Sequence, residues 1–159
     1  MKPKIILWIK AGLIREAAGS LKTQFGSKKQ KVKLSVDKGL PPVQGNPDRL
    51  IQVLTNLLSN AHKYTPEGGR ITITTTAEGD SLRIEVKDTG IGMTADEQKG
   101  LFTKFYRADN EETRTVPGTG LGLWITRSIV EMHGGEIKIE SRKGQGTQVS
   151  FSLPVINHE

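Results

Sequence analysis

Apolar residues recur at helical spacing in three long stretches of the chain. This periodicity predicts amphipathic helices, each with one face turned towards a core. A fourth, shorter helix is predicted over residues 94–105, ahead of a polar segment. The three long helices are predicted over about residues 13–28, 47–64 and 121–133.

Local signals set the limits of the second and third helices. Asn46 is a residue type that caps helices, and Pro47 suits the first helical position because its missing N–H is not needed there. The helix then ends near Tyr64, before a turn-forming Thr-Pro-Glu-Gly-Gly sequence. The third helix is ended by Gly134 and Gly135.

Apolar and polar residues alternate in five further segments, as in strands with one buried face. Two pairs of these segments are joined by short glycine-containing turns and so predict two hairpins. Because both helices and hairpins connect the strands, we predict an α+β fold, a two-layer α/β sandwich in which a mixed sheet packs on helices. The strands are predicted over residues 31–37, 70–78, 81–88, 136–141 and 147–154.

The chain has 159 residues, of which 35% are hydrophobic and 25% charged, and it has no cysteine. This length fits one domain, and the absence of cysteine excludes disulfides and thiolate metal sites. The longest apolar run, residues 5–9, is far shorter than the roughly 20 residues that cross a bilayer. We therefore expect no direct membrane insertion by this segment. The lack of cysteine is compatible with a reducing cytosol, and we expect a cytoplasmic location, which a membrane anchor elsewhere in the parent protein would also allow.

The chain is basic, with 23 Lys and Arg against 17 Asp and Glu and a net charge of +6. Such a charge favours an anionic partner, which could be a nucleic acid, a phospholipid or a nucleotide, although a solvated basic surface would give the same balance. Aromatic residues make up only 5% of the chain and are not interleaved with the basic residues. We therefore expect no nucleic-acid binding.

One face of the second helix carries candidate metal and phosphate ligands. Asn56 and Asn60 lie four residues apart and share a face, with Lys63 on the next turn. An amide oxygen suits a hard cation such as Mg²⁺, and an ammonium suits a phosphate. Surface or capping amides would have the same spacing, so this pattern alone leaves both interpretations open.

A second candidate follows a predicted strand, where Asp88 precedes Gly90 and Gly92. A carboxylate at a strand end can accept a hydrogen bond from an amino group, while the glycines let the backbone approach a flat ligand. The alternative is an ordinary turn of the Asp-Gly type.

Three alternating glycines, Gly118, Gly120 and Gly122, open the third helix. Bare N–H groups at a helix N-terminus bind phosphate oxygens, although a simple loop hinge would use the same residues. The segment is not a dinucleotide fingerprint, because Leu123 stands where the third glycine would be needed. The chain also lacks the Gly-Lys-Ser/Thr of a Walker A loop.

Taken in order, these segments resemble the catalytic and ATP-binding domain of sensor histidine kinases, in the GHKL group of ATPases. The resemblance covers about residues 13–155 and implies the Bergerat, or GHKL, ATP-binding fold with ATP and Mg²⁺ as cofactors. Five motifs carry it: the N box (56–69), the first glycine box (88–93), the F box (101–109), the second glycine box (118–125) and the last glycine-threonine box (144–151).

The resemblance implies roles for individual residues. Asn60 would be the Mg²⁺ ligand, supported by Asn56, while Lys63 would reach a phosphate and Tyr64 would line the nucleotide pocket. Arg107 would reach the γ-phosphate, so that the catalytic set would be Asn60, Lys63 and Arg107. The phosphates would lie in a loop of Gly118, Thr119, Gly120, Leu121 and Gly122.

For the base, the resemblance implies that Asp88 accepts from the adenine amino group. Gly90 and Gly92 would let the base approach, and Thr147 would complete the polar contact through water. The two glycine boxes would then hold the two ends of the nucleotide. The segment between them, about residues 96–117, would be a lid that is poorly ordered without ligand.

One feature of these kinases is missing from the chain. None of His62, His133 and His158 stands in the phosphoacceptor motif of a histidine, an acidic residue and a nearby proline. We therefore expect a catalytic domain at residues 13–159, preceded at 1–12 by a leader or by the remnant of a linker from a dimerisation domain. Its partners would be the histidine-containing dimerisation domain and, through the phosphohistidine, a response regulator.

Two other functions use the same ATP-binding fold. One is an anti-sigma-factor serine kinase, which would phosphorylate a serine of a partner. The other is an ATP-driven conformational ATPase, in which nucleotide closes a dimer. A module that binds nucleotide without transferring phosphate is a third possibility.

Overall fold

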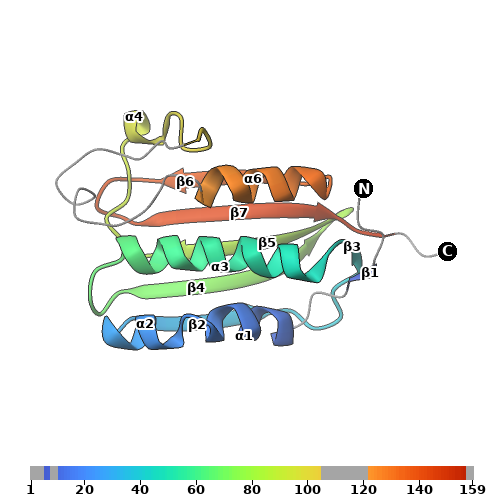
Figure 1. Ribbon diagram of the computed structural model, residues 1–159, viewed down its shortest axis with the longest axis horizontal. Coiled ribbons are helices and arrows are strands. Elements are labelled where there is room, and N and C mark those ends of the chain that lie inside the picture. The colour runs from blue at the N-terminus through green and yellow to red at the C-terminus, as the bar shows by residue number, and fades with distance from the viewer. Residues whose placement is uncertain (1–5, 8–10, 105–121, 157–159) are drawn as a thin grey trace.

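Five strands form one mixed sheet in the order β2-β4-β5-β7-β6 (Figure 1). The computed structural model describes residues 6–7, 11–104 and 122–156. β2 and β4 run parallel, and every other neighbouring pair in this sheet is antiparallel. The strands are β2 (Lys31–Val36), β4 (Arg70–Glu78), β5 (Ser81–Asp88), β6 (Glu136–Ser141) and β7 (Thr147–Pro154).

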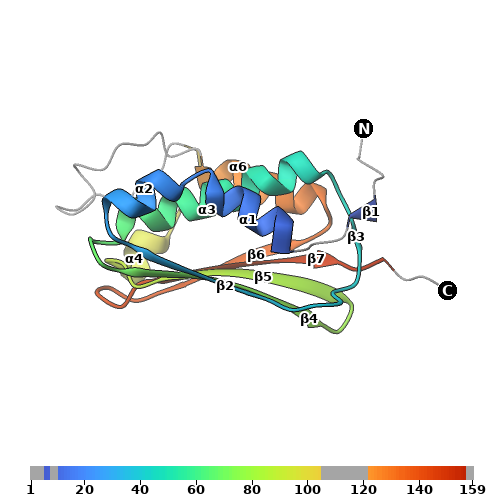
Figure 2. The same ribbon diagram turned by 90° about the horizontal axis from the view of Figure 1, so that it is seen from below.

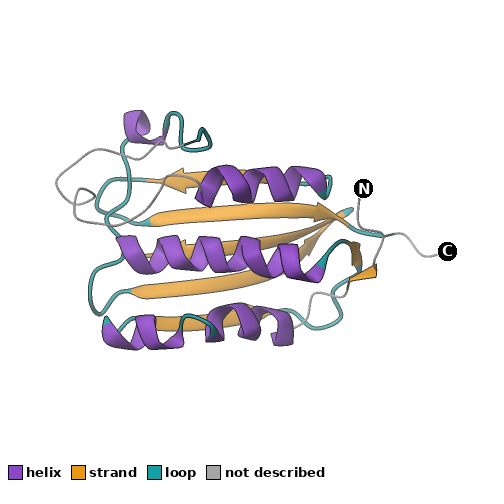
Figure 3. Ribbon diagram, in the orientation of Figure 1, coloured by secondary structure: helices purple, strands orange, loops and turns teal. Residues whose placement is uncertain are grey.

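The helices cover one face of this sheet and leave the other face open among the described residues (Figure 2). They form the second layer of an α+β sandwich, as the alternation of helices and hairpins predicts (Figure 3). The helices of this layer are α1 (Ala11–Gly19), α2 (Lys22–Ser27), α3 (Pro47–Tyr64) and α6 (Gly122–Met132). A further short helix, α4 (Ala95–Gln98), lies beyond the edge of the layer (Figure 1).

The core lies between the two layers and is built from the apolar faces that the sequence pattern predicts. Leu50, Leu54 and Leu58 of α3 recur every four residues and are at most 1% exposed. They belong to one buried cluster with the inward residues of the strands, such as Ile73 and Phe151. Each of these side chains contributes roughly 1.5–3 kcal/mol by leaving water.

α3 and α6 keep the limits predicted from the sequence to within one residue. The Asn46 side chain accepts hydrogen bonds from the N–H groups of Asp48 and Arg49, at 3.0 and 3.3 Å, and so caps α3. Past α6, Gly134 adopts a φ of +79°, a left-handed conformation that suits glycine.

The helix predicted over residues 13–28 is wrong as a single helix, because it is broken after Gly19. The hydroxyl of Ser20 donates to the carbonyl of Ala17 at 2.7 Å, and the N–H of Leu21 turns back to Ala18 at 3.1 Å. Glycine and serine at this point offer the backbone an alternative to helix. The break lets Leu21, 8% exposed, join the core.

The helix predicted over residues 94–105 is also wrong in length, since α4 has only four residues. Thr94 and Glu97 form a capping box at its start, which is the local signal that the sequence carries. Gly100 adopts a φ of +79° soon after, and this left-handed residue prevents the helix from continuing.

A small second sheet of β1 (Ile6–Leu7) and β3 (Val43–Gln44) was not predicted.

Candidate functional site

The elements that carry the sequence motifs meet at one end of the sandwich (Figure 1). The C-terminal ends of α3 and β5, the turn between β6 and β7 and the start of α6 all lie there. This follows from the topology, because β5 and β6 run towards that end and β7 leaves it. Residues far apart in the sequence, such as Asn56 and Thr126, which are 70 positions apart, are therefore brought together.

Asp88, the last residue of β5, is the buried carboxylate at this end, with 9% of its surface exposed. Its Oδ1 atom accepts hydrogen bonds from the N–H groups of Gly90 and Thr147, at 2.9 and 3.1 Å. Burial raises the pKa of the carboxyl, and these two hydrogen bonds act in the opposite direction. Because Oδ1 already accepts both of these hydrogen bonds, Oδ2 is the atom that would accept the predicted hydrogen bond from an amino group.

The glycines of the first glycine box are required by close packing. A Cβ atom at Gly90 would collide with the carbonyl oxygen of Tyr64 and lie 2.9 Å from Asp88 Oδ1. Gly92 has a φ of +67°, and a Cβ atom there would collide with the carbonyl of Arg142. The turn after β5 is thus pressed between the end of α3 and the β6–β7 turn.

Backbone hydrogen bonds hold the turn in this position. The N–H of Ile91 donates to the Tyr64 carbonyl at 3.0 Å, and the carbonyl of Ile91 accepts from the N–H of Gly144 at 2.6 Å. The hydroxyl oxygen of Thr65 borders the same turn, fully buried and without a hydrogen-bond partner. A displacement of the C-terminal end of α3 would therefore also move the turn that follows Asp88.

Thr147 contacts Asp88 through its backbone N–H, and its predicted contact with a base stays a prediction. Its hydroxyl lies 2.8 Å from that of Ser141, the last residue of β6. Ser141 in turn accepts from the N–H of Met93 at 2.9 Å. Ser141 was not among the predicted site residues, because its register opposite Thr147 becomes visible only when the two strands pair.

The predicted polar face of α3 lies beside α6. The Asn56 amide donates to the hydroxyl of Thr126, a fully buried residue of α6, at 3.4 Å. Asn60 and Lys63 follow on the same face and are half-buried, as is Tyr64 at the end of the helix. The structure thus places these four residues along the side of α3 that leads to the Asp88 turn.

Two residues outside the predicted motifs hold the end of α3. The Lys28 ammonium donates to the carbonyls of His62, Lys63 and Thr65, at 2.9, 3.2 and 3.2 Å. The Gln30 amide donates to two of these carbonyls, those of His62 and Thr65, at 3.0 and 2.7 Å. We call these two residues the α3 clamp.

His62 packs beside the clamp and has structural contacts. Its Nδ1 lies 2.8 Å from the side-chain oxygen of Gln30, and its ring meets that of Phe25 edge to face. Burial lowers the pKa of His62, and the nearby charges of Lys28 and Lys63 lower it further. A neutral ring with its proton on Nδ1 satisfies the Gln30 contact.

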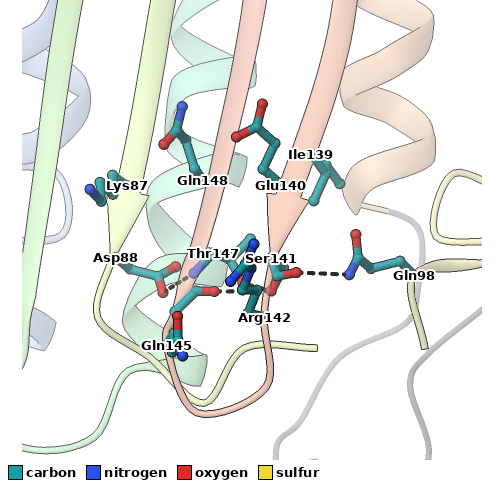
Figure 4. Close-up of a pocket in the computed structure, with 11 residues that line it drawn as sticks. Lys87, Asp88, Gln98, Ile139, Glu140, Ser141, Arg142, Gln145, Thr147 and Gln148 are labelled. Carbon is teal, nitrogen blue, oxygen red and sulfur yellow. Dashed lines mark hydrogen bonds between the residues drawn. The ribbon is translucent and has the colours of Figure 1, made fainter. Parts of the chain in front are cut away.

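An open cavity of about 490 Å³ lies beside Asp88 at the ends of β5, β6 and β7 (Figure 4). Asp88, Ser141 and Thr147 line it together with Gln98 of α4, whose amide donates to the Ser141 carbonyl at 3.1 Å. Most of the residues that line it have polar side chains, Lys87 and Glu140 among them. Gln98 of α4 therefore lines the same cavity as Asp88 and Thr147, the residues predicted to contact the base.

Two cation–aromatic contacts connect the segment after α4 to α6. The Lys104 ammonium lies 4.3 Å from the centre of the Trp124 ring, and the Arg127 guanidinium lies 5.4 Å from that of Phe102. Such contacts contribute about 0.5–1 kcal/mol at exposed sites. The start of the F box is thus attached to the first turns of α6.

Several predicted residues lie outside the described residues. They include the predicted γ-phosphate contact and most of the phosphate loop, that is Arg107, Gly118, Thr119, Gly120 and Leu121. The predicted lid is described only over 96–104, which form the end of α4 and the turns after it. Gly122 begins α6, and a Cβ atom there would meet no neighbouring atom within 4 Å.

The described residues offer neither a cluster of metal ligands nor a membrane-spanning helix. Residues 6–7, 11–104 and 122–156 contain no group of three or more His, Asp and Glu side chains that could hold a metal ion. Within the same ranges, none of the helices has the length and apolarity needed to cross a membrane.

A family model described as histidine kinase-, DNA gyrase B- and HSP90-like ATPase matches residues 45–157. Among curated proteins, the sensor histidine kinase WalK of Bacillus subtilis is 46% identical over 114 residues, which make up 70% of this chain. The matched region is 19% of WalK, so the chain spans about a fifth of the length of this relative.

Solved structures give the same match in three dimensions. The nucleotide-free catalytic domain of histidine kinase ThkA has a TM-score of 0.77 and 30% identity, covering 91% of this chain and 92% of that one. Full-length ShkA in complex with AMPPNP has a TM-score of 0.82 and 29% identity over 96% of this chain and 32% of that one. ThkA in complex with the response regulator TrrA has a TM-score of 0.76 and 27% identity over 94% of this chain and 41% of that one.

Proposed function

Because the chain belongs to the family of histidine kinase-, DNA gyrase B- and HSP90-like ATPases, and within it is an ATP-binding catalytic domain of the histidine kinase kind, we propose that it transfers the γ-phosphoryl group of ATP to a histidine on a separate dimerisation domain. Residues 13–159 would form the catalytic unit. The dimerisation domain would present the acceptor histidine, since none of the three histidines of this chain stands in an acceptor motif.

The observation that carries this proposal is the Asp88 turn. A buried carboxylate is fixed through Oδ1 by two backbone N–H groups, beside glycines that admit no side chain. Such a group can only accept hydrogen bonds at neutral pH, so it suits a ligand that presents an N–H. The 6-amino group of adenine is a donor of this kind, and AMPPNP, the ligand of the related ShkA structure, carries it.

The residues at this end of the sandwich fit an adenine nucleotide. Gly90 and Gly92 leave the backbone free of side chains next to Asp88, and the unpartnered hydroxyl of Thr65 borders the same turn. Tyr64 would line the pocket, and Thr147 would contact the base through water. The phosphates would extend towards the start of α6, where Gly118, Thr119, Gly120, Leu121 and Gly122 would hold them.

The α3 face would meet the metal and the phosphates. We assign Asn60 as the Mg²⁺ ligand, supported by Asn56, with Lys63 on a phosphate and Arg107 on the γ-phosphate. Mg²⁺ is usually held by one or two protein oxygens together with phosphates and water, so an amide without a carboxylate cluster fits it. When bound, the cation would neutralise the charge that develops during transfer.

The residues of this chain would contribute positioning and charge to the transfer. Asp88 would fix the base, and the α3 face would fix the triphosphate, so that its terminal phosphorus lies in line with the acceptor nitrogen. Phosphoryl transfer depends mainly on such positioning and charge neutralisation. The acceptor nitrogen forms the new bond to phosphorus while the bond to the bridging oxygen of ADP breaks.

A response regulator would then receive the phosphoryl group from the phosphohistidine. The related ThkA is seen in complex with the response regulator TrrA, which supports a partner of this class. Since ATP and the response regulator are cytoplasmic, we propose that this domain works in the cytoplasm.

The proposal is tested by supplying the acceptor in trans. The chain is mixed with Mg-ATP labelled at the γ-phosphate and with purified helical dimerisation domains, each carrying its acceptor histidine. We expect acid-labile label on a dimerisation domain. The chain alone should bind ATP without acquiring label.

Two controls make this result specific. The same dimerisation domain with glutamine at the acceptor position should remain unlabelled. The Asp88→Ala variant should lose most of the transfer at limiting ATP. Acid-stable label on a serine would favour the serine-kinase alternative, and ATP hydrolysis without label on any partner would favour the conformational ATPase.

A further inference from the structure

The face of the sheet that the helices leave open carries four basic side chains at the end nearest the candidate site (Figure 2). Lys31 and Lys33 belong to β2, Arg70 to β4 and Lys87 to β5. Along each strand these exposed residues alternate with residues that pack into the core, so all four project from the open face. We call these four residues the basic cluster.

Strand pairing brings the four side chains close together. Lys31 stands directly beside Arg70 in the parallel pair of β2 and β4, and only Thr72 separates Lys33 from Lys87 across β4. None of the four forms an ion pair with a described residue. Like charges on directly neighbouring strand positions destabilise a sheet. A cost of this kind without a local compensation is expected where a surface has a function.

Protection of the sheet edge explains only part of the cluster. β2 is an edge strand, and lysines on an edge strand hinder its pairing with another chain. Arg70 and Lys87, however, lie on β4 and β5, which have a neighbouring strand on both sides. The cluster as a whole therefore fits an anionic partner that covers several strands at once.

The other outward residues of the sheet restrict the class of this partner. A protein interface is centred on aromatic or large apolar side chains, and a single-stranded nucleic acid stacks its bases on aromatic rings. The open face offers neither along its five described strands. Apart from Pro154 at the end of β7, its outward residues are polar or charged. On the three inner strands they include Thr72, Thr74, Thr76, Ser81, Arg83, Glu85, Gln148, Ser150 and Ser152.

We infer that the basic cluster docks the open face of the sheet onto a surface of anionic phospholipids. Such a surface attracts Lys and Arg through its negative potential alone and needs no apolar anchor. The contact is with headgroups and involves no insertion into the bilayer. The helical layer, which carries Asn60 on α3, then faces away from the lipid and stays open to nucleotide.

The expected strength follows from the number of cations. Each Lys or Arg close to an anionic membrane strengthens binding by about fivefold, so four of them supply about five hundredfold. The attraction should disappear at high salt, because the screening length falls from about 10 Å at 0.1 M to about 3 Å at 1 M.

The test is co-sedimentation of the chain with vesicles of phosphatidylcholine, with and without phosphatidylserine. We expect binding only to the vesicles that contain phosphatidylserine, and release at high salt. Lys33→Gln combined with Lys87→Gln should weaken this binding by about 25-fold. Because the cluster has no ion pairs to lose, the double variant should keep the melting temperature of the wild type.

A matched control separates the cluster from net charge. Arg15 and Lys22 are exposed residues of α1 and α2 in the helical layer, on the other side of the molecule. Arg15→Gln combined with Lys22→Gln removes the same charge and should change vesicle binding little. Equal losses in the two double variants would mean that net charge causes the binding, and the inference would be wrong.

A label checks which face meets the lipid. The chain has no cysteine, so a single introduced cysteine carries a fluorophore at a chosen place. Thr74→Cys places it on the open face, and Thr23→Cys places it on α2. With a quencher on the lipid headgroups, the label at position 74 should be quenched much more strongly. Equal quenching at both positions would overturn the inference.

Two further outcomes would also overturn it. One is a wild-type chain that does not bind phosphatidylserine vesicles even at low salt. The other is cluster-dependent binding to polyglutamate or single-stranded RNA without binding to vesicles, which would assign the cluster to another polyanion. Calorimetry with Mg-ATP keeps this test apart from the proposed function. Loss of nucleotide binding would refute that function and leave the vesicle result standing.

Discussion

Asp88 combines burial with charge, because its carboxyl is 9% exposed and has no cationic partner among the described residues. Two backbone N–H groups compensate part of the desolvation, but burial is the larger effect and the pKa is raised. A raised pKa means that the folded domain holds the proton more readily than the unfolded chain does. Stability therefore falls as the pH rises from the ordinary value of 3.8 through the raised value in the fold.

We accordingly predict that Asp88→Asn stabilises the empty domain while removing its preference for adenine. The amide oxygen can still accept from Gly90 and Thr147, but no charge has to be buried. At pH 7 the free energy of unfolding should rise by about 1 kcal/mol, a gain that is common for stabilising substitutions, which often cost function at a strained active site. Denaturant unfolding without nucleotide measures this change.

The pH dependence checks the cause of that gain. The advantage of Asp88→Asn over the wild type should be full at pH 7 and should shrink as the pH is lowered through the raised pKa and below 3.8, where the folded and the unfolded chain both carry the proton. Asp80→Asn is the matched control, because Asp80 is an exposed residue of the β4–β5 turn and should change little at any pH. A gain from Asp88→Asn that is the same at every pH would contradict the desolvation argument.

Among the secondary-structure elements, those with strong local signals were predicted well. α3 begins where Asn46 and Pro47 indicate, and the strands follow the alternation of apolar residues. The errors fall where a glycine or a local hydrogen bond interrupts an otherwise helical pattern. Leu21 and Phe25 keep helical spacing with the residues of α1, yet the chain breaks between α1 and α2 because Ser20 forms a local hydrogen bond.

The α3 clamp could not be predicted from the sequence, since Lys28 lies 34 to 37 positions from its partners. Lys29 adopts a φ of +51° after α2, and this left-handed residue turns the chain so that Lys28 and Gln30 both face α3. A cation at the C-terminal end of a helix also complements the helix dipole. The clamp lies outside residues 45–157, the range of the family model.

We predict that Lys28→Met destabilises the domain and weakens nucleotide binding. Methionine keeps much of the apolar stem but removes three hydrogen bonds to the last carbonyls of α3. The free energy of unfolding should fall by about 1–2 kcal/mol. Urea unfolding measures this loss, and ATP affinity should fall too, because the Tyr64 carbonyl holds the turn beside Asp88.

Lys29→Met is the matched control for this experiment. The Lys29 side chain is 80% exposed, and its ion pair with Glu67 spans 3.8 Å at the surface. Such pairs contribute about 0–1 kcal/mol, so the substitution should change stability by no more than about 0.5 kcal/mol. Equal effects of the two substitutions would mean that loss of charge, and not loss of the clamp, causes the change.

At the scale of the whole molecule, the candidate site depends on the order of the strands. The sequence predicted the five strands and the hairpins, but not that β7 would lie between β5 and β6. That order sets the N–H of Thr147 beside Asp88 and the hydroxyl of Ser141 beside Thr147. Motif resemblance could therefore suggest Asp88 and Thr147 as contacts of a base, whereas their hydrogen bond to each other and the place of Ser141 required the three-dimensional register.

A ligand at this site would contact both layers of the sandwich, since Asn60 belongs to the helices and Asp88 to the sheet. Binding that requires both layers in place stabilises the whole domain. At a nucleotide concentration of 100 times Kd the expected gain is about 2.7 kcal/mol. We therefore predict that Mg-ATP raises the melting temperature of the domain, and that the gain depends on Mg²⁺ through Asn60.

Asn60→Ala tests that dependence. Melting temperatures are measured with ATP in Mg²⁺ and with ATP in EDTA. The variant should lose the additional gain that Mg²⁺ gives the wild type and should match the wild type in EDTA, because only a metal ligand has been removed. Gln52→Ala, which removes an amide two turns earlier on α3, should retain the full gain. An equal loss with and without Mg²⁺ would instead mean that Asn60 contacts the nucleotide directly or supports the fold, and the metal assignment would be wrong.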